Sequence, residues 1–166
     1  MLDEAPRSFS QKRHLPDLPN PLRSSGMMQA DKERFVWQVC QPFDIRTVVA
    51  ADGITQSVEG EEPQPLGPEM VQEVIRQISI SDIFRGDFDQ LQSAFRLSRR
   101  EGASGEPWKV TMTPRAARLA DIIAEIDVSG CQVVEQVSIR YLSGGRDEIL
   151  VVGKVAPSGP AACPTN

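Results

Sequence analysis

Apolar and polar side chains alternate with a period of two along most of the chain, which is the pattern of strands with one buried face. In the segment 34–40, Phe35, Trp37 and Val39 fall on one face, and Val36 and Gln38 fall on the other. Such segments predict about eight to ten strands, with segment 24–30 at an edge of the sheet. They are 9–15, 24–30, 34–40, 46–51, 54–58, 92–100, 108–113, 121–128, 132–142 and 148–155.

Turn-forming residues separate these segments. Asp52-Gly53 predicts a two-residue hairpin turn, and Ser143-Gly144-Gly145 predicts another before the last strand. In segment 121–128 the alternation places Ile122 and Ile126 on one face and Ile123 on the other. A short helical turn is expected at 114–119.

One segment in the middle of the chain departs from the alternation and predicts a helix over 68–84. A single apolar stripe at i, i+3, i+4 and i+7 carries it, made of Val71, Val74, Ile75 and Ile78. Gly86 then favours the end of the helix. Because strands lie on both sides of this helix in sequence, we expect it to cover an apolar face of the sheet.

The order of these elements predicts the α+β class, with strands in consecutive antiparallel hairpins. A long sheet of this kind curls, so the helix is expected against its concave side. At 166 residues the chain suits one domain. The inner side chains then either pack into a core or line a cavity, and the pattern alone favours a core.

Charge and composition argue against some partners. The net charge of −5, without a Lys/Arg cluster among aromatics, argues against nucleic acid. No apolar run approaches the ~20 residues that a membrane-spanning helix needs. The first residues lack a basic segment followed by an apolar one, so no secretion signal is visible in this chain.

The cysteines predict neither a disulfide framework nor a zinc site, because Cys40, Cys131 and Cys163 are odd in number and form no C-x-x-C pair. We expect Cys40 and Cys131 to be buried thiols and Cys163 to be a thiol of the C-terminal tail. A disulfide between Cys40 and Cys131 is the alternative.

Catalytic chemistry has little support in the sequence. The single histidine, His14, has no neighbouring partner for a catalytic or metal-binding arrangement, and no phosphate-binding or dinucleotide-binding glycine motif occurs. We therefore expect no catalytic residue, no metal and no cofactor. An enzyme would need a polar cluster at a cavity mouth, for which Arg34, Asp52 and Tyr141 are the candidates.

Six motifs in register resemble the LolA-like lipoprotein carriers, in particular a divergent subgroup with a PLRSSG segment. The resemblance covers nearly the whole chain. Its residues are Phe9-Ser10-Gln11; Pro21 to Gly26; Phe35-Val36-Trp37 with Gln41-Pro42-Phe43; Ala51-Asp52-Gly53; Gly86-Asp87-Phe88 with Phe95; and Trp108 to Pro114 with Leu119.

The resemblance implies a strongly curved antiparallel sheet, an incomplete β-barrel, with a helical lid at 68–86 over an apolar cavity for acyl chains. It implies a domain over 9–156, after an N-terminal extension at 1–8 and before a disordered tail at 157–166. The implied lining is Phe35, Trp37, Val39, Val71, Val74, Ile75, Ile78, Phe95, Leu97, Trp108, Val110, Met112, Ile122, Ile126, Val137 and Ile139.

The same resemblance implies a monomeric periplasmic carrier that takes lipid or lipoprotein acyl chains from an inner-membrane donor to an outer-membrane acceptor. A binding or sensor module with a packed interior is the alternative, and an enzyme recruited from the same scaffold is a further one.

The sequence departs from the family pattern at two places. The family places a helix before the F-x-Q motif, whereas only eight residues precede Phe9, so an incomplete lid or a truncated chain is expected. Asp31-Lys32 stands where better-known carriers have an arginine-proline pair implicated in lipoprotein handling. A glycolipid or another hydrophobic molecule is therefore an alternative cargo.

Overall fold

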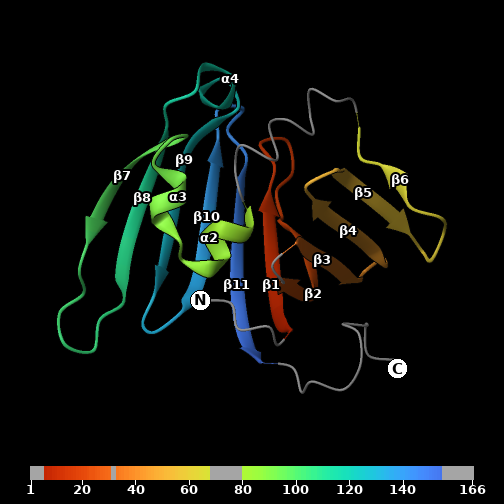
Figure 1. The fold of residues 1–166 in the computed structure, drawn as a ribbon, viewed down its shortest axis with the longest axis horizontal. Helices are drawn as coiled ribbons and strands as arrows, with labels where there is room; N and C mark the ends of the chain where they lie inside the picture. Colours follow the sequence, from red (N-terminus) through yellow and green to blue (C-terminus); the bar gives the residue numbers. More distant parts are fainter. Residues whose placement is uncertain (1–5, 31–32, 68–79, 155–166) are drawn as a thin grey trace.

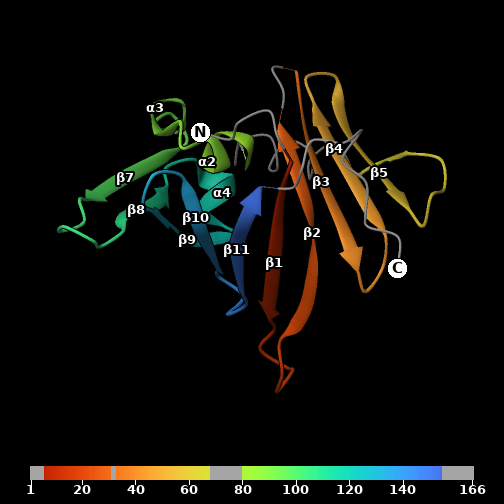
Figure 2. The ribbon, with the colours of Figure 1, turned by 90° about the horizontal axis from the view of Figure 1, so that it is seen from below.

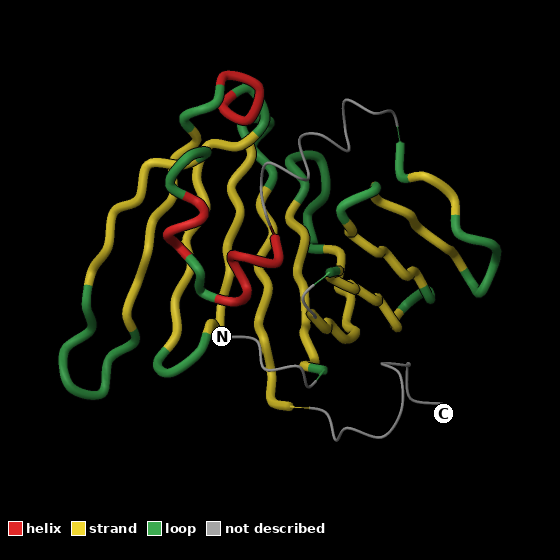
Figure 3. Tube along the Cα trace, in the orientation of Figure 1, coloured by secondary structure: helices red, strands yellow, loops and turns green. Residues whose placement is uncertain are grey.

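The computed structural model describes residues 6–30, 33–67 and 80–154. They form a single curved antiparallel sheet, with short helices inside the curve (Figures 1 and 2). The strands are β1 (Arg7–His14), β2 (Leu22–Ala30), β3 (Arg34–Gln41), β4 (Ile45–Ala50), β5 (Gly53–Val58), β6 (Gln64–Pro65), β7 (Phe95–Arg100), β8 (Trp108–Pro114), β9 (Ile123–Gly130), β10 (Val134–Tyr141) and β11 (Arg146–Lys154). The helices are α2 (Ile80–Arg85), α3 (Phe88–Leu91) and α4 (Ala117–Ala120), the red segments of Figure 3.

The strands lie in the order β6-β5-β4-β3-β2-β1-β11-β10-β9-β8-β7. Each strand therefore neighbours the next one in sequence, except that the sheet is open between β6 and β7. The first and last strands close this order in the middle of the sheet, where β1 pairs with β11 along its whole length. This confirms the predicted curved, incomplete barrel of antiparallel strands.

Two details of the strand prediction are wrong. Strand β2 is not an edge strand, because it pairs with both β1 and β3; the pairing of β1 with a strand more than a hundred residues away leaves no local trace in the sequence. The described sheet has 11 strands, more than predicted. The additional strand, β6, pairs only Gln64 and Pro65 with β5, and two residues are too few to show an alternation.

The turns and helix ends follow the sequence closely. The hairpin of β4 and β5 is confirmed, although its two loop residues are Ala51 and Asp52, since Ala50 pairs with Gly53. Gly86 ends α2 with a φ of 73°, as predicted, and α4 lies where a helical turn was expected. The predicted helix 68–84 is described only from Ile80 onward, so its apolar stripe lies outside the described residues.

The predictions for Cys40 and Cys131 are wrong, and Cys163 lies outside the described residues. Cys40 is half-buried and disulfide-bonded. Cys131 is free and exposed, so it is neither a buried thiol nor the partner of Cys40. Cys131 follows the last residue of β9, in the connection to β10, where a side chain meets solvent.

Gly26, the last residue of the PLRSSG segment, is fixed by close packing of two strands. A Cβ added at this position would lie 1.8 Å from the backbone oxygen of Gln38 on β3, which cannot move without disrupting the sheet. The pairing of β2 with β3 shifts register between Ser25 and Gly26. This irregularity brings the two backbones together.

We expect Gly26→Ala to destabilise the protein by at least about 2 kcal/mol, because inserting a methyl group into a closed site forces backbone movement. Urea unfolding followed by circular dichroism measures the change. Ser24→Ala, two residues away on the same strand, is the control and should change stability by less than about 0.5 kcal/mol. Equal effects of the two substitutions would contradict this account.

Candidate functional site

The inner face of the sheet is a continuous apolar surface, and α2 and α3 lie against it (Figure 2). Side chains from strands in both halves of the sheet and from all three described helices meet in one cluster. The fully or almost fully buried members are Phe9, Met28, Ala30, Phe35, Ile83, Phe84, Phe88, Leu91, Phe95, Val110, Met112, Leu119, Ile123, Ile126, Val128, Val134, Val137, Ile149 and Val151.

Four aromatic rings join β1, β3 and α2 at the centre of this face. The rings of Phe9 and Trp37 stack with centroids 3.8 Å apart. Phe84, on α2, stacks on Phe35 at 6.0 Å and lies 5.8 Å from Trp37. Aromatic pairs at such distances contribute about 0.5–1.5 kcal/mol beyond the area they bury. The end of the predicted lid helix is therefore held directly on the strand that carries the F-x-W alternation.

A second aromatic contact holds α3 on the other half of the sheet. Phe88 meets Trp108, on β8, edge to face with centroids 5.8 Å apart. The guanidinium of Arg99, on β7, lies over the ring of Phe88, 5.9 Å from the ring centre. The two tryptophans of the chain thus mark the two halves of the inner face, each beneath one helix.

Most of the predicted lining residues that the structure describes share this face. Six are buried in the cluster: Phe35, Phe95, Val110, Met112, Ile126 and Val137. Five are half-buried and packed against it: Trp37, Val39, Leu97, Trp108 and Ile139. The remaining helix residues of the prediction, Val71, Val74, Ile75 and Ile78, lie outside the described residues.

Ile122 is the exception, because it is 43% exposed and precedes β9. Ile123 takes the inner position instead and is 1% exposed. The pairing of β9 with β10 shifts register between Arg140 and Tyr141, so that an extra residue of β9 is accommodated there. Such a bulge reverses the alternation on one side of it. The predicted orientations of Ile122 and Ile123 are therefore wrong, while Ile126 lies on the inner face as predicted.

The sequence prediction missed inner-face residues of two kinds. Ile149 and Val151 alternate within the predicted last strand, so their period of two was available as a signal. Ile83, Phe84 and Leu91 belong to short helices beyond the predicted apolar stripe, and no periodicity identifies them.

A polar cluster closes one end of the inner face. The carboxylate of Asp147 is buried and accepts hydrogen bonds from Nε of Arg13 at 2.8 Å, from Nη2 of Arg13 at 3.0 Å and from the hydroxyl of Tyr141 at 2.9 Å. The hydrogen bonds to Asp147 raise the pKa of Arg13. Burial, and then the charge of Asp147, raise the pKa of Tyr141 far above its usual range. This fully bonded arrangement is structural in character.

The residues proposed for an enzyme do not assemble. Tyr141 lies with Asp147 and Arg13, at the end of the sheet where β2 begins, since Arg13 pairs with Leu22. Arg34 and Asp52 lie where β2 ends. Strand β2 separates the two ends by roughly 27 Å at 3.3 Å per residue.

Arg7 lies on the same face at the opposite end of β1 from Arg13. It is 6% exposed, and its Nη1 donates a hydrogen bond to the backbone oxygen of Val134 at 3.1 Å. Burial lowers the pKa of Arg7, while the charge of Glu135 opposes this shift. The buried guanidinium of Arg7 therefore makes the end of the apolar face near β10 polar.

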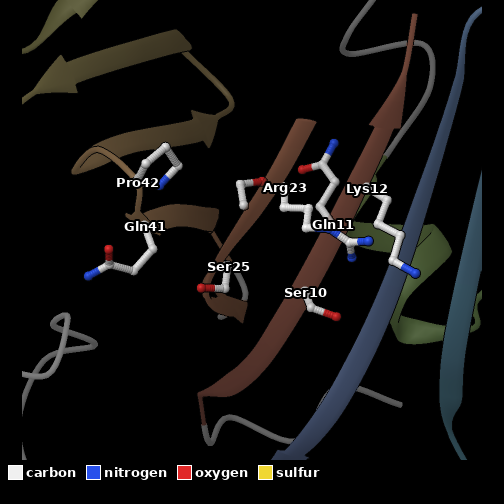
Figure 4. Close-up of a pocket in the computed structure, with 8 residues that line it drawn as sticks. Ser10, Gln11, Lys12, Arg23, Ser25, Gln41 and Pro42 are labelled. Carbon is white, nitrogen blue, oxygen red and sulfur yellow. The ribbon is translucent and has the colours of Figure 1, made fainter. Parts of the chain in front are cut away.

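The outer face of the sheet carries a separate pocket, between β1, β2 and the end of β3 (Figure 4). Its volume is 360 Å³, and all lining residues except Pro42 have polar or charged side chains, although most of the surface that they present to the pocket is apolar. Within the described ranges, no group of three or more His, Cys, Asp or Glu side chains could hold a metal ion. No helix in those ranges is long and apolar enough to cross a membrane.

The fold and the site define a class of protein, an open half-barrel whose apolar inner face is covered by short helices. A family model described as "Outer membrane lipoprotein carrier protein LolA-like" matches residues 4–159. The chain therefore belongs to the LolA-like family, as its motifs suggested. No curated protein matches it.

Two solved structures are similar to the chain. A LolA superfamily protein from Nitrosomonas europaea aligns with a TM-score of 0.51 at 9% identity, over 96% of this chain and 88% of that one. A putative outer membrane lipoprotein-sorting protein domain from Vibrio parahaemolyticus aligns at 0.43 and 7% identity, over 95% and 88%. At these identities the first likeness supports the fold alone.

We expect Tyr141 to stay protonated in the folded protein as the pH rises past about 10, the usual tyrosine value. Its pKa is raised on folding, so the stabilisation it provides is complete below pH ~10 and is lost as the pH rises further. Tyr141 is the single tyrosine, so near-ultraviolet absorbance of tyrosinate reports on it alone.

The control for this titration is the urea-unfolded protein, which should ionise at about pH 10. Tyr141→Phe should in turn show a flatter dependence of stability on pH in the alkaline range. Tyrosinate forming at the same pH in folded and unfolded protein would contradict the assigned hydrogen bond.

Proposed function

We propose that this protein is a periplasmic carrier that binds lipid or lipoprotein acyl chains on the inner face of its sheet, beneath α2 and α3. The observation that carries the proposal is the aromatic and aliphatic inner face, contributed by strands in both halves of the sheet and covered by short helices. Membership of the LolA-like family supports it. In this role the protein accepts cargo from an inner-membrane donor and passes it to an outer-membrane acceptor.

Helices α2 and α3, which cover the inner face, are suited to displacement by an acyl chain. Helix α3, with four residues, is far shorter than the ~12–15 residues that an isolated helix needs, and α2 is described from Ile80 to Arg85. They are held on the sheet by Ile83, Phe84, Phe88 and Leu91. Lifting them from the sheet exposes these side chains and the strand residues beneath them, whereas global unfolding exposes the whole inner cluster.

Burying the four helix side chains and burying an acyl chain release similar free energies. Burying four large apolar side chains contributes roughly 6–12 kcal/mol, at about 1.5–3 kcal/mol each. An acyl chain of palmitoyl length gains roughly 12 kcal/mol when it leaves water, at about 0.8 kcal/mol per methylene. One chain can therefore replace the cover on the inner face with little net change. This near balance suits a carrier, which has to release what it binds.

A binding module with a permanently packed interior is the second candidate. It is favoured by the same four helix side chains, because they already occupy the inner face. The two candidates differ in whether the cover moves when an acyl chain is offered.

Quenching of tryptophan fluorescence tests the carrier proposal directly. Trp37 and Trp108 are the two tryptophans, and both pack against the inner cluster. We expect a brominated long-chain fatty acid to quench their emission saturably, because bromine quenches only at close range. The same fatty acid without bromine is the matched control.

The variants Trp37→Phe and Trp108→Phe then report on which half of the face holds the chain. The proposal fails if brominated acid does not quench and lipid extraction of freshly purified protein yields no acyl species. That result would leave the packed module.

The substitution Phe84→Ala separates the two candidates by its effect on binding. It removes the ring that stacks on Phe35 and Trp37, and it should lower stability by about 3 kcal/mol. In a carrier it should also tighten acyl binding, since less cover has to be displaced. Isothermal titration with the fatty acid measures the affinity.

Leu119→Ala is the matched control for that substitution. Leu119 is completely buried on α4, so its truncation should cost about 2–5 kcal/mol. It should leave acyl affinity unchanged, because no residue of α2 or α3 depends on it for the aromatic contacts described above. Equal binding by wild type and Phe84→Ala would support the packed module.

A further inference from the structure

The outer-face pocket is lined by residues that the acyl-binding face does not use. They come from three neighbouring strands: Ser10, Gln11 and Lys12 of β1; Arg23, Ser24 and Ser25 of β2; and Gln41 of β3 with Pro42 (Figure 4). Three of them, Arg23, Ser24 and Ser25, are the polar centre of the PLRSSG segment. The pocket therefore includes part of the PLRSSG segment, one of the motifs that resemble the LolA-like family.

Strand register places both charged groups and two of the three hydroxyl groups of the pocket on the outer face, whereas Gln11 and its partner Ser24 alternate to the inner side. Phe9 points into the inner cluster, so Ser10 and Lys12, on either side of Gln11, alternate to the outside. Ser10 lies opposite Ser25, and Lys12 lies opposite Arg23. Directly opposed residues of antiparallel strands project from the same face, with Cβ atoms about 4.5–5.5 Å apart.

The pairing of Lys12 with Arg23 is unfavourable by itself, because like charges directly opposite each other destabilise a sheet. The other cross-strand neighbour of Lys12 is Glu148 on β11. That carboxylate is already engaged, by Nε2 of His14 at 3.0 Å and by Nη2 of Arg146 at 3.3 Å. Lys12 therefore shares Glu148 with these two side chains, and the hydrogen bond from His14 lowers the pKa of that carboxyl together with the charge of Lys12. Arg23 makes no ion pair within the described ranges.

Other lining groups are also available to a ligand. Among residues 6–30, 33–67 and 80–154, the outward side chains of Ser10, Ser25 and Gln41 make no hydrogen bond to protein. The lining contains no carboxylate, although the whole chain carries a net charge of −5. The pocket therefore offers two cations, the hydroxyls of Ser10 and Ser25 and the amide of Gln41, contributed by three strands.

We propose that this pocket binds a phosphate group. Arginine presents a fork of N–H donors that matches phosphate oxygens, and lysine adds a compact charge. Hydroxyl and amide groups on the neighbouring strands supply further donors for a tetrahedral anion. At 360 Å³, the pocket has several times the volume of one water molecule in the liquid, about 30 Å³, and so admits a substituted phosphate.

The phosphate can belong to the headgroup of an anionic phospholipid or to a soluble phosphate compound, since both present the same chemistry. Binding would offset the repulsion between Lys12 and Arg23, and this is the source of the expected affinity. The inference does not depend on acyl binding, because the pocket and the inner face lie on opposite sides of the sheet.

Chemical-shift mapping of ¹⁵N-labelled protein tests the proposal with inorganic phosphate as the probe, at constant ionic strength set by sodium chloride. We expect saturable shifts for the amides of 10–12 and 23–25. The double variant Lys12→Gln/Arg23→Gln should lose at least about tenfold in affinity, since one factor of ten corresponds to only about 1.4 kcal/mol. It should fold normally, because it removes a repulsion from an exposed face.

The matched control is Arg96→Gln/Arg100→Gln, which removes the same charge from exposed positions of β7. It should keep full phosphate affinity. Equal losses in the two double variants would overturn the proposal, because they would show a response to net charge alone. Unsaturable shifts, or an acidic peptide shifting the pocket amides where phosphate does not, would also overturn it.

Vesicle co-sedimentation distinguishes the two sources of phosphate. If phosphatidylglycerol vesicles bind the wild type, phosphatidylcholine vesicles do not, and inorganic phosphate competes, the phosphate is a lipid headgroup. If phosphate shifts the amides but neither vesicle binds, the ligand is soluble. Quenching by brominated fatty acid should be the same in the Lys12/Arg23 double variant as in wild type, so failure of one proposal leaves the other intact.

Discussion

The pairing of β1 with β11 determines the architecture of this protein. It joins residues 7–14 to residues 146–154 and merges two runs of hairpins into one sheet. Once the ends of the chain are fixed in the middle, the edges of the sheet must be β6 and β7, which are consecutive in sequence. The connection between them has to pass from one edge to the other. It brings α2 and α3 against the concave face, where their apolar side chains and those of the strands exclude water together.

This arrangement gives the two faces of the sheet different chemistry. The inner face joins aromatic rings of β1, β3 and β8 to helix residues. The outer face carries ion pairs between neighbouring strands, such as Arg140 with Glu125 at 3.4 Å and Lys109 with Asp127 at 3.3 Å. Exposed pairs of this kind contribute little to stability. The fold is therefore held by its inner face and its backbone pairing, and the outer face is free to serve recognition.

The sequence predicted what depends on local periodicity and missed what depends on pairing over long distances. Alternation located ten of the strands, and eleven of the twelve predicted lining residues in the described ranges lie on the inner face. Ile122 failed because a bulge opposite Tyr141 reverses the alternation, and a bulge is a property of two strands. The edge position expected for β2 failed for the same reason. Cys40 was misjudged because a disulfide depends on tertiary geometry that spacing does not contain.

The two inward arginines of β1 show how the apolar face is bounded. Arg7 and Arg13 are six residues apart, which corresponds to roughly 20 Å of strand. Arg13 is neutralised by the buried carboxylate of Asp147, and its end of the face is closed by a complete set of hydrogen bonds. Arg7 has one hydrogen bond, to a backbone oxygen, although it is more deeply buried. The charge of Glu135 also acts on Arg7, without a hydrogen bond to it among the described residues. The two ends of the inner face therefore compensate their cations differently: a buried carboxylate binds Arg13 directly, whereas a carbonyl oxygen and a carboxylate that makes no hydrogen bond to the cation stabilise Arg7.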